Sequence, residues 1–295
     1  MKNKENYTKK KGYFEGWYFK HQSKELSISF IPGININRNG DKYAFIQIIT
    51  ENKSYNVNYD YKDFSISKDK LTIKIKDNIF SLSGVIVNIK NKDINIKGRL
   101  IYKNITPIKK DIMGPFAHLP FMECFHGVLS LNHTVEGSLF INYKEFKFNG
   151  GKGYIEKDSG TSFPDKYLWV QSNYFKNNYI SIMVSIANIP FLGFKFMGCI
   201  AIVYYEGMEY ILATYNGVKI ISYNEKGLII KKGEYRLEIE IEELHPQKLL
   251  APNGGEMIRT ITENISCNAR FKFYKGKNLI FNLDSDKTSF EYVSN

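Results

Sequence analysis

The chain has 295 residues but only three cysteines, Cys124, Cys199 and Cys267. They are odd in number and far apart, so they can build neither a disulfide framework nor a Cys-x-x-Cys metal site. Sparse cysteines without a pairing pattern are typical of a reducing compartment. The sequence therefore predicts a cytoplasmic protein.

Long apolar runs are also missing. The longest, such as residues 200–205, are far shorter than the ~20 residues of a membrane-spanning helix. The basic N-terminus is not followed by an apolar segment, so no signal peptide is expected. There is no G-x-S-x-G elbow, and the glycine-rich stretch 150–153 lacks P-loop spacing and is interpreted as a turn. These absences disfavour membrane helices, α/β-hydrolases and P-loop enzymes.

Negative charge is scarce relative to positive charge. The chain has 41 Lys and Arg against 30 Asp and Glu, a net charge of +11. The lysines are spread between Ile and Asn, as on the wet face of strands, and the one run, Lys9-Lys10-Lys11, is short. We therefore expect no nucleic-acid partner, although a basic surface suits peripheral contact with an anionic membrane.

Apolar residues make up 43% of the chain and aromatic residues 15%, enough for a sizeable core. Apolar and polar residues alternate with period two, for example over 71–76, 94–99 and 236–242, whereas no long stretch has helical periodicity. This pattern predicts an all-β fold of antiparallel strands, and so long a series of antiparallel strands is expected to curl into barrels. The glycine-rich stretch near the midpoint suggests halves over 1–148 and 149–295.

Polar groups stand among large aromatics in the second half of the chain. If residues 154–158 are extended, Glu156 and Asp158 share one face and Lys157 takes the other. These carboxylates belong either to a pocket or to a solvated strand edge with structural ion pairs. Glu15 and Lys20, in another aromatic segment, are expected to close a barrel through an ion pair.

A second polar group follows on one strand face. If residues 169–173 form a strand, Trp169, Gln171 and Asn173 share a face. Two irregular, proline-bearing segments, 114–127 and 244–257, have the character of binding loops attached to a barrel.

A metal site has little support in the sequence. Candidate ligands are His118, Glu123, Cys124, His126 and His133, but their spacing matches no established zinc pattern. On a strand, Glu123 and Cys124 would also point to opposite faces. We expect no metal.

Several of these segments together resemble the tocopherol cyclase-like family. The matching blocks are Glu15-Gly16-Trp17-Tyr18-Phe19-Lys20, Pro120-Phe121-Met122-Glu123-Cys124 with His126-Gly127, Gly153-Tyr154-Ile155-Glu156-Lys157-Asp158, Ser162-Phe163-Pro164 through Trp169-Val170-Gln171-Ser172-Asn173, and Leu250-Ala251-Pro252 with Gly255-Glu256-Met257. The blocks run in order over nearly the whole chain. One position departs from the pattern, because Ser159 stands where the family has tryptophan.

The resemblance implies two lipocalin-like antiparallel β-barrel halves packed in tandem, with an apolar pocket at or near their contact. It also implies an activity that closes a ring by adding a phenol hydroxyl across a prenyl double bond, with no cofactor. Protonating an alkene needs a neutral carboxylic acid, which an apolar pocket favours, and the cation that forms needs aromatic walls.

The residues of the matching blocks supply candidates for each role. As the acid we expect Asp158 first, Glu123 second and Glu156 third. As walls facing the cation we expect Trp17, Tyr18 and Trp169. As groups that orient the hydroxyl or accept its proton we expect Gln171, Asn173 and His126.

Two functions stay open at this point. The first is a cofactor-independent cyclase or isomerase acting on a prenylated or otherwise hydrophobic small molecule. The second is a lipocalin-like carrier that binds such a molecule unchanged, since a barrel can hold a ligand without chemistry. Carboxylates among aromatics favour the enzyme, whereas Ser159 favours the carrier or a changed substrate.

Overall fold

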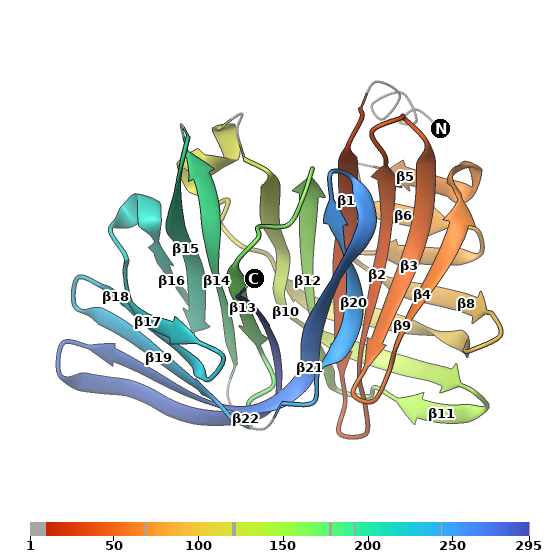
Figure 1. Cartoon of the computed structure of the whole chain (residues 1–295). Coiled ribbons are helices and arrows are strands. Elements are labelled where there is room, and N and C mark those ends of the chain that lie inside the picture. Colours follow the sequence, from red (N-terminus) through yellow and green to blue (C-terminus); the bar gives the residue numbers. More distant parts are fainter. Residues whose placement is uncertain are drawn as a thin grey trace.

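The protein is nearly all-β, as predicted (Figure 1). The computed structural model describes residues 10–67, 69–119, 122–176, 179–191, 193–242 and 244–294. Within these residues the strands form two antiparallel sheets, and the helices are three short 3₁₀ turns. None of the described helices has the length and apolar character that a membrane crossing requires.

The first sheet holds strands of two kinds. Some, such as 84–90, have one buried and one wet face, as the period-two pattern predicts, whereas 13–22, 27–36 and 151–160 are largely buried on both faces. Its elements are β1 (Tyr13–Gln22), β2 (Ser27–Ile36), β3 (Lys42–Thr50), β4 (Ser54–Asp60), η2 (Tyr61–Asp63), β5 (Phe64–Ser67), β6 (Thr72–Ile75), β7 (Asn78–Ser81), β8 (Gly84–Lys90), β9 (Asn95–Thr106), η3 (Gly114–His118), β10 (Cys124–Ile141), β11 (Lys144–Lys147) and β12 (Gly151–Gly160).

The second sheet likewise combines strands buried on both faces, such as 167–172, with strands that alternate, such as 235–241. Its elements are β13 (Tyr167–Ser172), β14 (Ile180–Phe191), β15 (Phe194–Tyr205), β16 (Met208–Ala213), η4 (Thr214–Asn216), β17 (Lys219–Asn224), β18 (Gly227–Lys232), β19 (Tyr235–Ile241), β20 (Gln247–Asn253), β21 (Glu256–Lys275) and β22 (Asn278–Val293).

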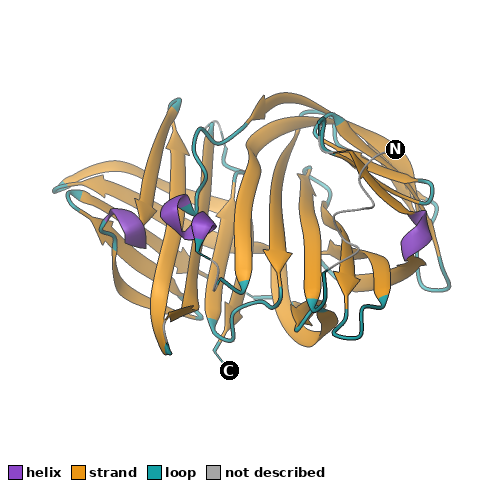
Figure 2. Ribbon diagram, turned by 90° about the horizontal axis from the view of Figure 1, so that it is seen from above, coloured by secondary structure: helices purple, strands orange, loops and turns teal. Residues whose placement is uncertain are grey.

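The two sheets share one topology. In each, the first strand pairs with the last, β1 with β12 and β13 with β22. In each, the chain leaves the fourth strand through a 3₁₀ turn and resumes at the other edge of the sheet. Each sheet curls towards a barrel (Figure 2). Its two edge strands are consecutive in the chain, β4 and β5 in the first sheet and β16 and β17 in the second. The chain thus contains a structural repeat.

The passage from one sheet to the other comes after the glycine-rich midpoint. Gly150 has a φ of +70° and makes the turn between β11 and β12. β12 then returns to the first sheet, where it pairs with both β1 and β10. We therefore propose to divide the halves between Gly160 and Tyr167 instead of at 148/149.

Apolar side chains fill the interior of each half and also the junction between the halves. Trp17 and Phe19 point into the first interior, whereas Phe271 and Phe273 belong to the second. Tyr18, between the first two on β1, lies instead in a third cluster with side chains from both halves. Because neighbouring strand residues face opposite ways, β1 and its counterparts line an interior and the junction at once.

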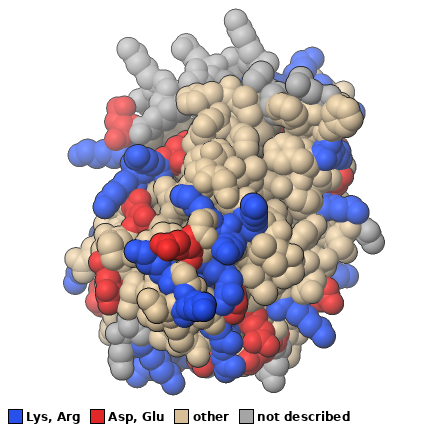
Figure 3. Space-filling model, turned by 90° about the vertical axis from the view of Figure 1, so that its left-hand side faces the viewer, with Lys and Arg blue, Asp and Glu red and all other residues tan. Residues whose placement is uncertain are grey.

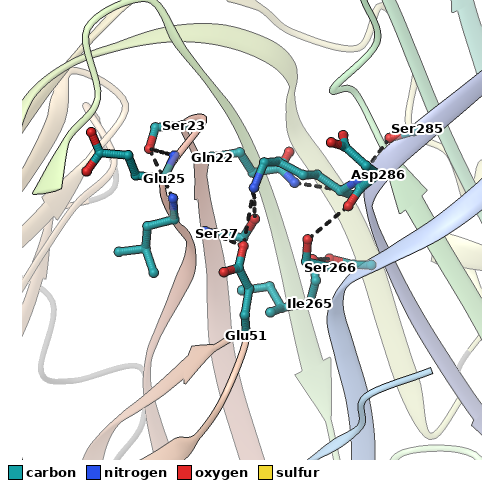
Figure 4. Close-up of polar contacts among 12 residues, drawn as sticks. Gln22, Ser23, Glu25, Ser27, Glu51, Ile265, Ser266, Ser285 and Asp286 are labelled. Atoms are coloured by element: carbon teal, nitrogen blue, oxygen red, sulfur yellow. Dashed lines mark hydrogen bonds and ion pairs between the residues drawn. The ribbon is translucent and has the colours of Figure 1, made fainter. Parts of the chain in front are cut away.

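Polar contacts also cross the junction. The Gln47 side-chain amide donates to the Leu250 carbonyl oxygen at 2.8 Å, and the Leu250 N–H donates back to Gln47 Oε1 at 2.9 Å. Gln22 Nε2 donates to the Lys287 carbonyl oxygen at 2.6 Å, while Lys287 Nζ lies 3.2 Å from Glu51 Oε1 (Figure 4). The two halves are therefore held in one register by buried, directional bonds.

A tight glycine turn at this junction gives a test of the fold. Gly255 has a φ of +81°, and an added Cβ would lie 2.2 Å from the Tyr13 backbone nitrogen. Gly276 has a φ of +60° but open space around it. We expect Gly255→Ala to lower the free energy of unfolding by about 3 kcal/mol, since it adds a steric clash to backbone strain. Gly276→Ala, the control, should cost about 1 kcal/mol. Urea unfolding measures both, and equal losses would contradict the close packing at Gly255.

Candidate active site

A cavity of about 150 Å³ lies at the junction of the halves. Its walls are mostly apolar, and side chains such as Phe14, Met113, Trp169 and Leu249 come from both halves. Four carboxyl groups and one histidine also line it, an unusual content for an apolar cavity. They are His126, Glu156, Asp158, Glu263 and Glu291.

The first half contributes an acidic group built on β12. The strand is extended, so Glu156 and Asp158 face the cavity together, as predicted. His126 lies directly across from Asp158 on β10, and its Nδ1 is 2.9 Å from Asp158 Oδ1. His126 Nε2 is 3.5 Å from Glu156 Oε2, which also accepts a hydrogen bond from the Tyr154 hydroxyl at 2.6 Å. The histidine thus bridges the two carboxylates.

Burial and charge set the protonation of this group. Burial raises the pKa of Glu156 to about 7, with His126 opposing the shift and Asp158 adding to it. Burial alone would lower the pKa of His126, but the charges of Glu156 and Asp158 outweigh it and raise the value to about 9. At neutral pH His126 therefore carries a proton, and Glu156 is poised to gain or lose one.

The second half contributes two further carboxyl groups, Glu263 and Glu291, which the sequence reasoning missed. They are paired across β21 and β22. The Tyr18 hydroxyl donates to Glu263 Oε1 at 2.5 Å, and the Tyr167 hydroxyl donates to Glu291 Oε2 at 2.6 Å. Burial raises the pKa of Glu291 to about 7 and that of Glu263 well above its usual range.

A signal for Glu263 was present in the sequence. It falls in phase with Ile261 and Ile265 on the buried face of β21, where the alternation calls for an apolar residue. A charged residue at such a position marks a buried acid. No comparable signal marks Glu291.

Three of the predicted ligand-facing residues line the cavity, namely Tyr18, His126 and Trp169. The Tyr18 and Trp169 rings form an edge-to-face pair with centroids 5.5 Å apart. Gly16 lies beside Asp158 in the β1–β12 register and also lines the cavity, so no side chain occupies the space there.

Three other predicted residues lie elsewhere. Trp17 is buried in the interior of the first half, because it occupies the face of β1 opposite Tyr18. Gln171 accepts a hydrogen bond from Lys20 at 2.9 Å, and Asn173 donates to the Gly153 carbonyl oxygen at 2.8 Å. Both polar groups are fully buried and join the halves instead of facing the cavity.

Glu123 is exposed and lines a separate surface hollow with Lys11 and Arg38. It lies at the turn before β10, where its carbonyl oxygen accepts the Thr161 N–H at 2.8 Å. This position keeps its carboxylate outside the junction, so we leave it out of the proposed acids. Its predicted neighbours Pro120 and Phe121 lie outside the described residues.

The position that departs from the family pattern does not line the cavity. Ser159 shares a strand face with Lys157, opposite Asp158, and bonds with Tyr13. Lys157 forms an ion pair with Glu15. The expected pairing of Glu15 with Lys20 is therefore wrong, because these two residues occupy opposite faces of β1.

Both predicted binding segments reach the cavity. The segment 114–127 contributes Phe116 and Met122, and the segment 244–257 contributes Pro252 and Met257. The second segment is less irregular than expected, since residues 247–253 form strand β20.

The described residues include one group with metal-binding geometry. Ligand atoms of His126, Glu156 and Asp158 lie within 4.8 Å of one another and could hold a divalent cation. The raised pKa of His126 means that a proton already balances these carboxylates at neutral pH. The expectation of no metal stays a prediction.

A family model described as tocopherol cyclase-like matches residues 92–291. No curated protein matches the sequence as a relative.

Several solved structures share the fold. Kievitone hydratase from Nectria haematococca is 12% identical with a TM-score of 0.56, over 96% of this chain and 89% of its own. CghA is 9% identical with a TM-score of 0.57, over 95% and 88%. A candidate AttH protein from Nitrosomonas europaea is 10% identical with a TM-score of 0.55, over 95% and 93%.

The raised pKa of Glu156 predicts a pH-dependent stability. The folded state binds its proton more tightly than the unfolded state, so this stabilisation is complete below pH 4.5 and is lost as pH rises through about 7. Glu156→Gln should flatten the fall in unfolding free energy over this range, an effect of up to roughly 3 kcal/mol. Urea unfolding across pH measures the slope, with exposed Glu145→Gln as control. An unchanged slope in Glu156→Gln would show that this carboxyl titrates normally.

Proposed function

The chain belongs to the tocopherol cyclase-like family, and from this premise we propose that it is an enzyme that cyclises or isomerises a hydrophobic small molecule by proton transfer in the junction cavity. The substrate class is a prenylated or polyene-like molecule. The reaction adds a hydroxyl of the substrate across one of its own double bonds, and needs no oxidant or reductant because substrate and product are isomers.

One observation carries this proposal: carboxyl groups whose pKa lies near neutrality line an otherwise apolar cavity. A carboxylic acid that is neutral at pH 7 can protonate an alkene, whereas an ordinary exposed one is ionised. Carriers of apolar ligands gain nothing from burying such groups, because burial of a carboxyl group costs free energy.

The first-half group supplies proton transfer in this proposal. At neutral pH the proton between Asp158 and His126 resides on the imidazole, because the pKa of His126 is raised to about 9. We propose that Asp158, the first predicted acid, orients His126 and stabilises its protonated form. Glu156, on the other side of the imidazole, exchanges protons with the substrate. The Tyr18 and Trp169 rings offer aromatic faces to a developing cation.

The similar structures fit this chemistry. One of them is named a hydratase, and addition of water to a double bond begins with the same transfer of a proton to carbon. At 9–12% identity these proteins establish the fold alone. The substrate assignment therefore rests on the cavity.

A carrier remains the second candidate. Its ligand would occupy the same apolar cavity and leave it unchanged. The predicted cytoplasmic location is compatible with both functions.

We further propose that the protein collects its ligand at an anionic membrane. The tip between β14 and β15 exposes Phe191 and Phe194, which are 42% and 78% exposed. Phe196 contacts Phe191 and also the cavity-lining Phe116, with ring centroids 6.2 and 6.3 Å apart. Apolar side chains thus lead from the tip to the cavity wall. On the face that carries β15 to β19, lysines and arginines gather below a mostly uncharged area (Figure 3).

Substitution of Asp158 tests the catalytic role. With the ligand recovered from the native host as substrate, Asp158→Asn should lower kcat about 100-fold or more, because His126 loses the carboxylate that holds its proton. Exposed Glu123→Gln should convert the ligand at the wild-type rate. Product is followed by chromatography and mass spectrometry. Full turnover by Asp158→Asn would overturn the role of this residue, and an unaltered ligand in every variant would favour the carrier.

Vesicle co-sedimentation tests the membrane contact. Phe194→Ser should weaken binding to phosphatidylserine-containing vesicles about tenfold, since burial of one aromatic side chain contributes roughly 1.5–3 kcal/mol. Phe140→Ser, at an exposed aromatic position that does not line the cavity, should bind as the wild type does. Added salt should weaken binding by all of them. Vesicle binding that is unchanged both by added salt and by Phe194→Ser would refute the proposed membrane contact.

A further inference from the structure

Glu263 and Glu291 form a buried pair that the chemistry assigned to the first half does not use. They are register partners on β21 and β22, and both line the cavity. Glu263 is fully buried and Glu291 is 9% exposed. Two ionised carboxylates on directly paired strand positions repel one another strongly in a medium of low dielectric constant.

The hydrogen bonds of Glu263 and Glu291 indicate where a proton shared by the two carboxyl groups would lie. Glu263 Oε1 accepts from Tyr18 and Glu291 Oε2 accepts from Tyr167. Glu263 Oε2 is buried and finds no donor among the described residues. The neighbouring Glu291 carboxyl is within hydrogen-bond reach. A proton on Glu263 Oε2, donated to Glu291, satisfies both groups, whereas two carboxylates would leave that oxygen without a partner.

The surroundings favour one negative charge on the pair. Lys20 Nζ is fully buried near Glu263, where it donates to Gln171 and to the Lys287 carbonyl oxygen. Burial lowers the pKa of Lys20 to about 7, although Glu263 opposes the shift. The groups that act on the pair from the elements around it are Tyr18 and Lys20 on β1, Glu156 and Asp158 on β12, and Tyr167 on β13. One cation cannot neutralise two carboxylates here.

We propose that Glu263 and Glu291 act as a carboxyl–carboxylate pair that donates a proton into the cavity from the second half, while the His126–Asp158–Glu156 group of the first half accepts one. This proposal rests on the proposed function and assigns the two proton transfers of that reaction to separate halves. The pair resembles in principle the carboxyl dyads that share one proton because both members cannot ionise together.

The reaction balances with these two groups. The pair gives a proton to an alkene carbon, and the π electrons form the new C–H bond. The substrate's hydroxyl oxygen then forms the C–O bond to the resulting cation, and its proton passes to a carboxylate of the first half. The protein has then moved one proton from the second half to the first, and exchange between the neighbouring carboxyls restores the starting state. No co-reactant is required.

Infrared spectroscopy tests the shared proton without any ligand. In the Glu156→Gln background, which removes the other carboxyl with a pKa near 7, a protonated carboxylic C=O band should persist at neutral pH. In Glu263→Gln the band that remains belongs to Glu291 and should fade as the pH rises through about 7. In Glu291→Gln the Glu263 band should fade at a lower pH than in the parent protein, because the repelling charge is gone. Exposed Glu225→Gln is the control and should keep the band. Absence of the band in the parent protein, or a band that titrates in both variants as it does in the parent, would overturn the pair.

Tyr18→Phe gives a second test of opposite sign, which also serves if Glu263→Gln does not fold. The Tyr18 hydroxyl stabilises the ionised form of Glu263, so its removal should raise the pH at which the protonated C=O band disappears. An unshifted band would contradict the assignment to Glu263.

Turnover of the host ligand then tests the donor role. Glu263→Gln and Glu291→Gln should each lower kcat about 100-fold with little change in KM. If the infrared result is as expected but both variants turn over the ligand normally, the two carboxyl groups share a proton but do not donate it to the substrate. No turnover by the wild type would count against the proposed function instead, while the infrared result would still decide the pair.

Discussion

Three buried carboxyl groups, Glu156, Glu263 and Glu291, share one cavity, and burial holds the pKa of each above its usual range. The cations buried with them are His126 and Lys20, and burial weakens the charge of Lys20 at neutral pH. Uncompensated buried charge is among the most costly features that a protein can hold. Protons therefore remain on some of these carboxyl groups at neutral pH, which is the state that acid catalysis on an uncharged substrate requires.

The tandem arrangement creates this site. Apolar side chains fill the interior of each half, so the usual ligand space of a small barrel is closed here. Strands β1, β12 and β13 present one face to an interior and the other to the junction, and β1 pairs with β12 as β13 pairs with β22. The same topology in both halves brings equivalent strands to the junction between them. An acidic group from each half then faces one cavity.

Strand alternation explains how much of this could be predicted. Period-two patterns identified the all-β fold, and the same rule placed Glu156 and Asp158 on one face. The rule also shows why Trp17 could not share a wall with Tyr18, its neighbour on β1. The family motif alone does not say which residues face the cavity, because adjacent residues of one block, such as Trp17 and Tyr18, lie on opposite sides of the strand.

Long-range pairing explains what the sequence could not supply. Glu263 and Glu291 lie far from the other site residues in the chain, and their register across β21 and β22 depends on bulges that no local pattern specifies. Gln171 and Asn173 had the composition of a ligand-binding face, yet their partners, Lys20 and Gly153, belong to the other half. The glycines near residue 150 marked a turn within a sheet because β12 pairs back onto β1.

The most direct measurement is incorporation of solvent deuterium into the ligand recovered from the native host. The purified protein is incubated with that ligand in heavy water, and the extracted product is exchanged back into ordinary water before mass spectrometry. Proton transfer to an alkene carbon predicts an isomer that keeps one deuterium on carbon. A ligand recovered with its original structure and no deuterium would contradict the catalytic account and identify the protein as a carrier.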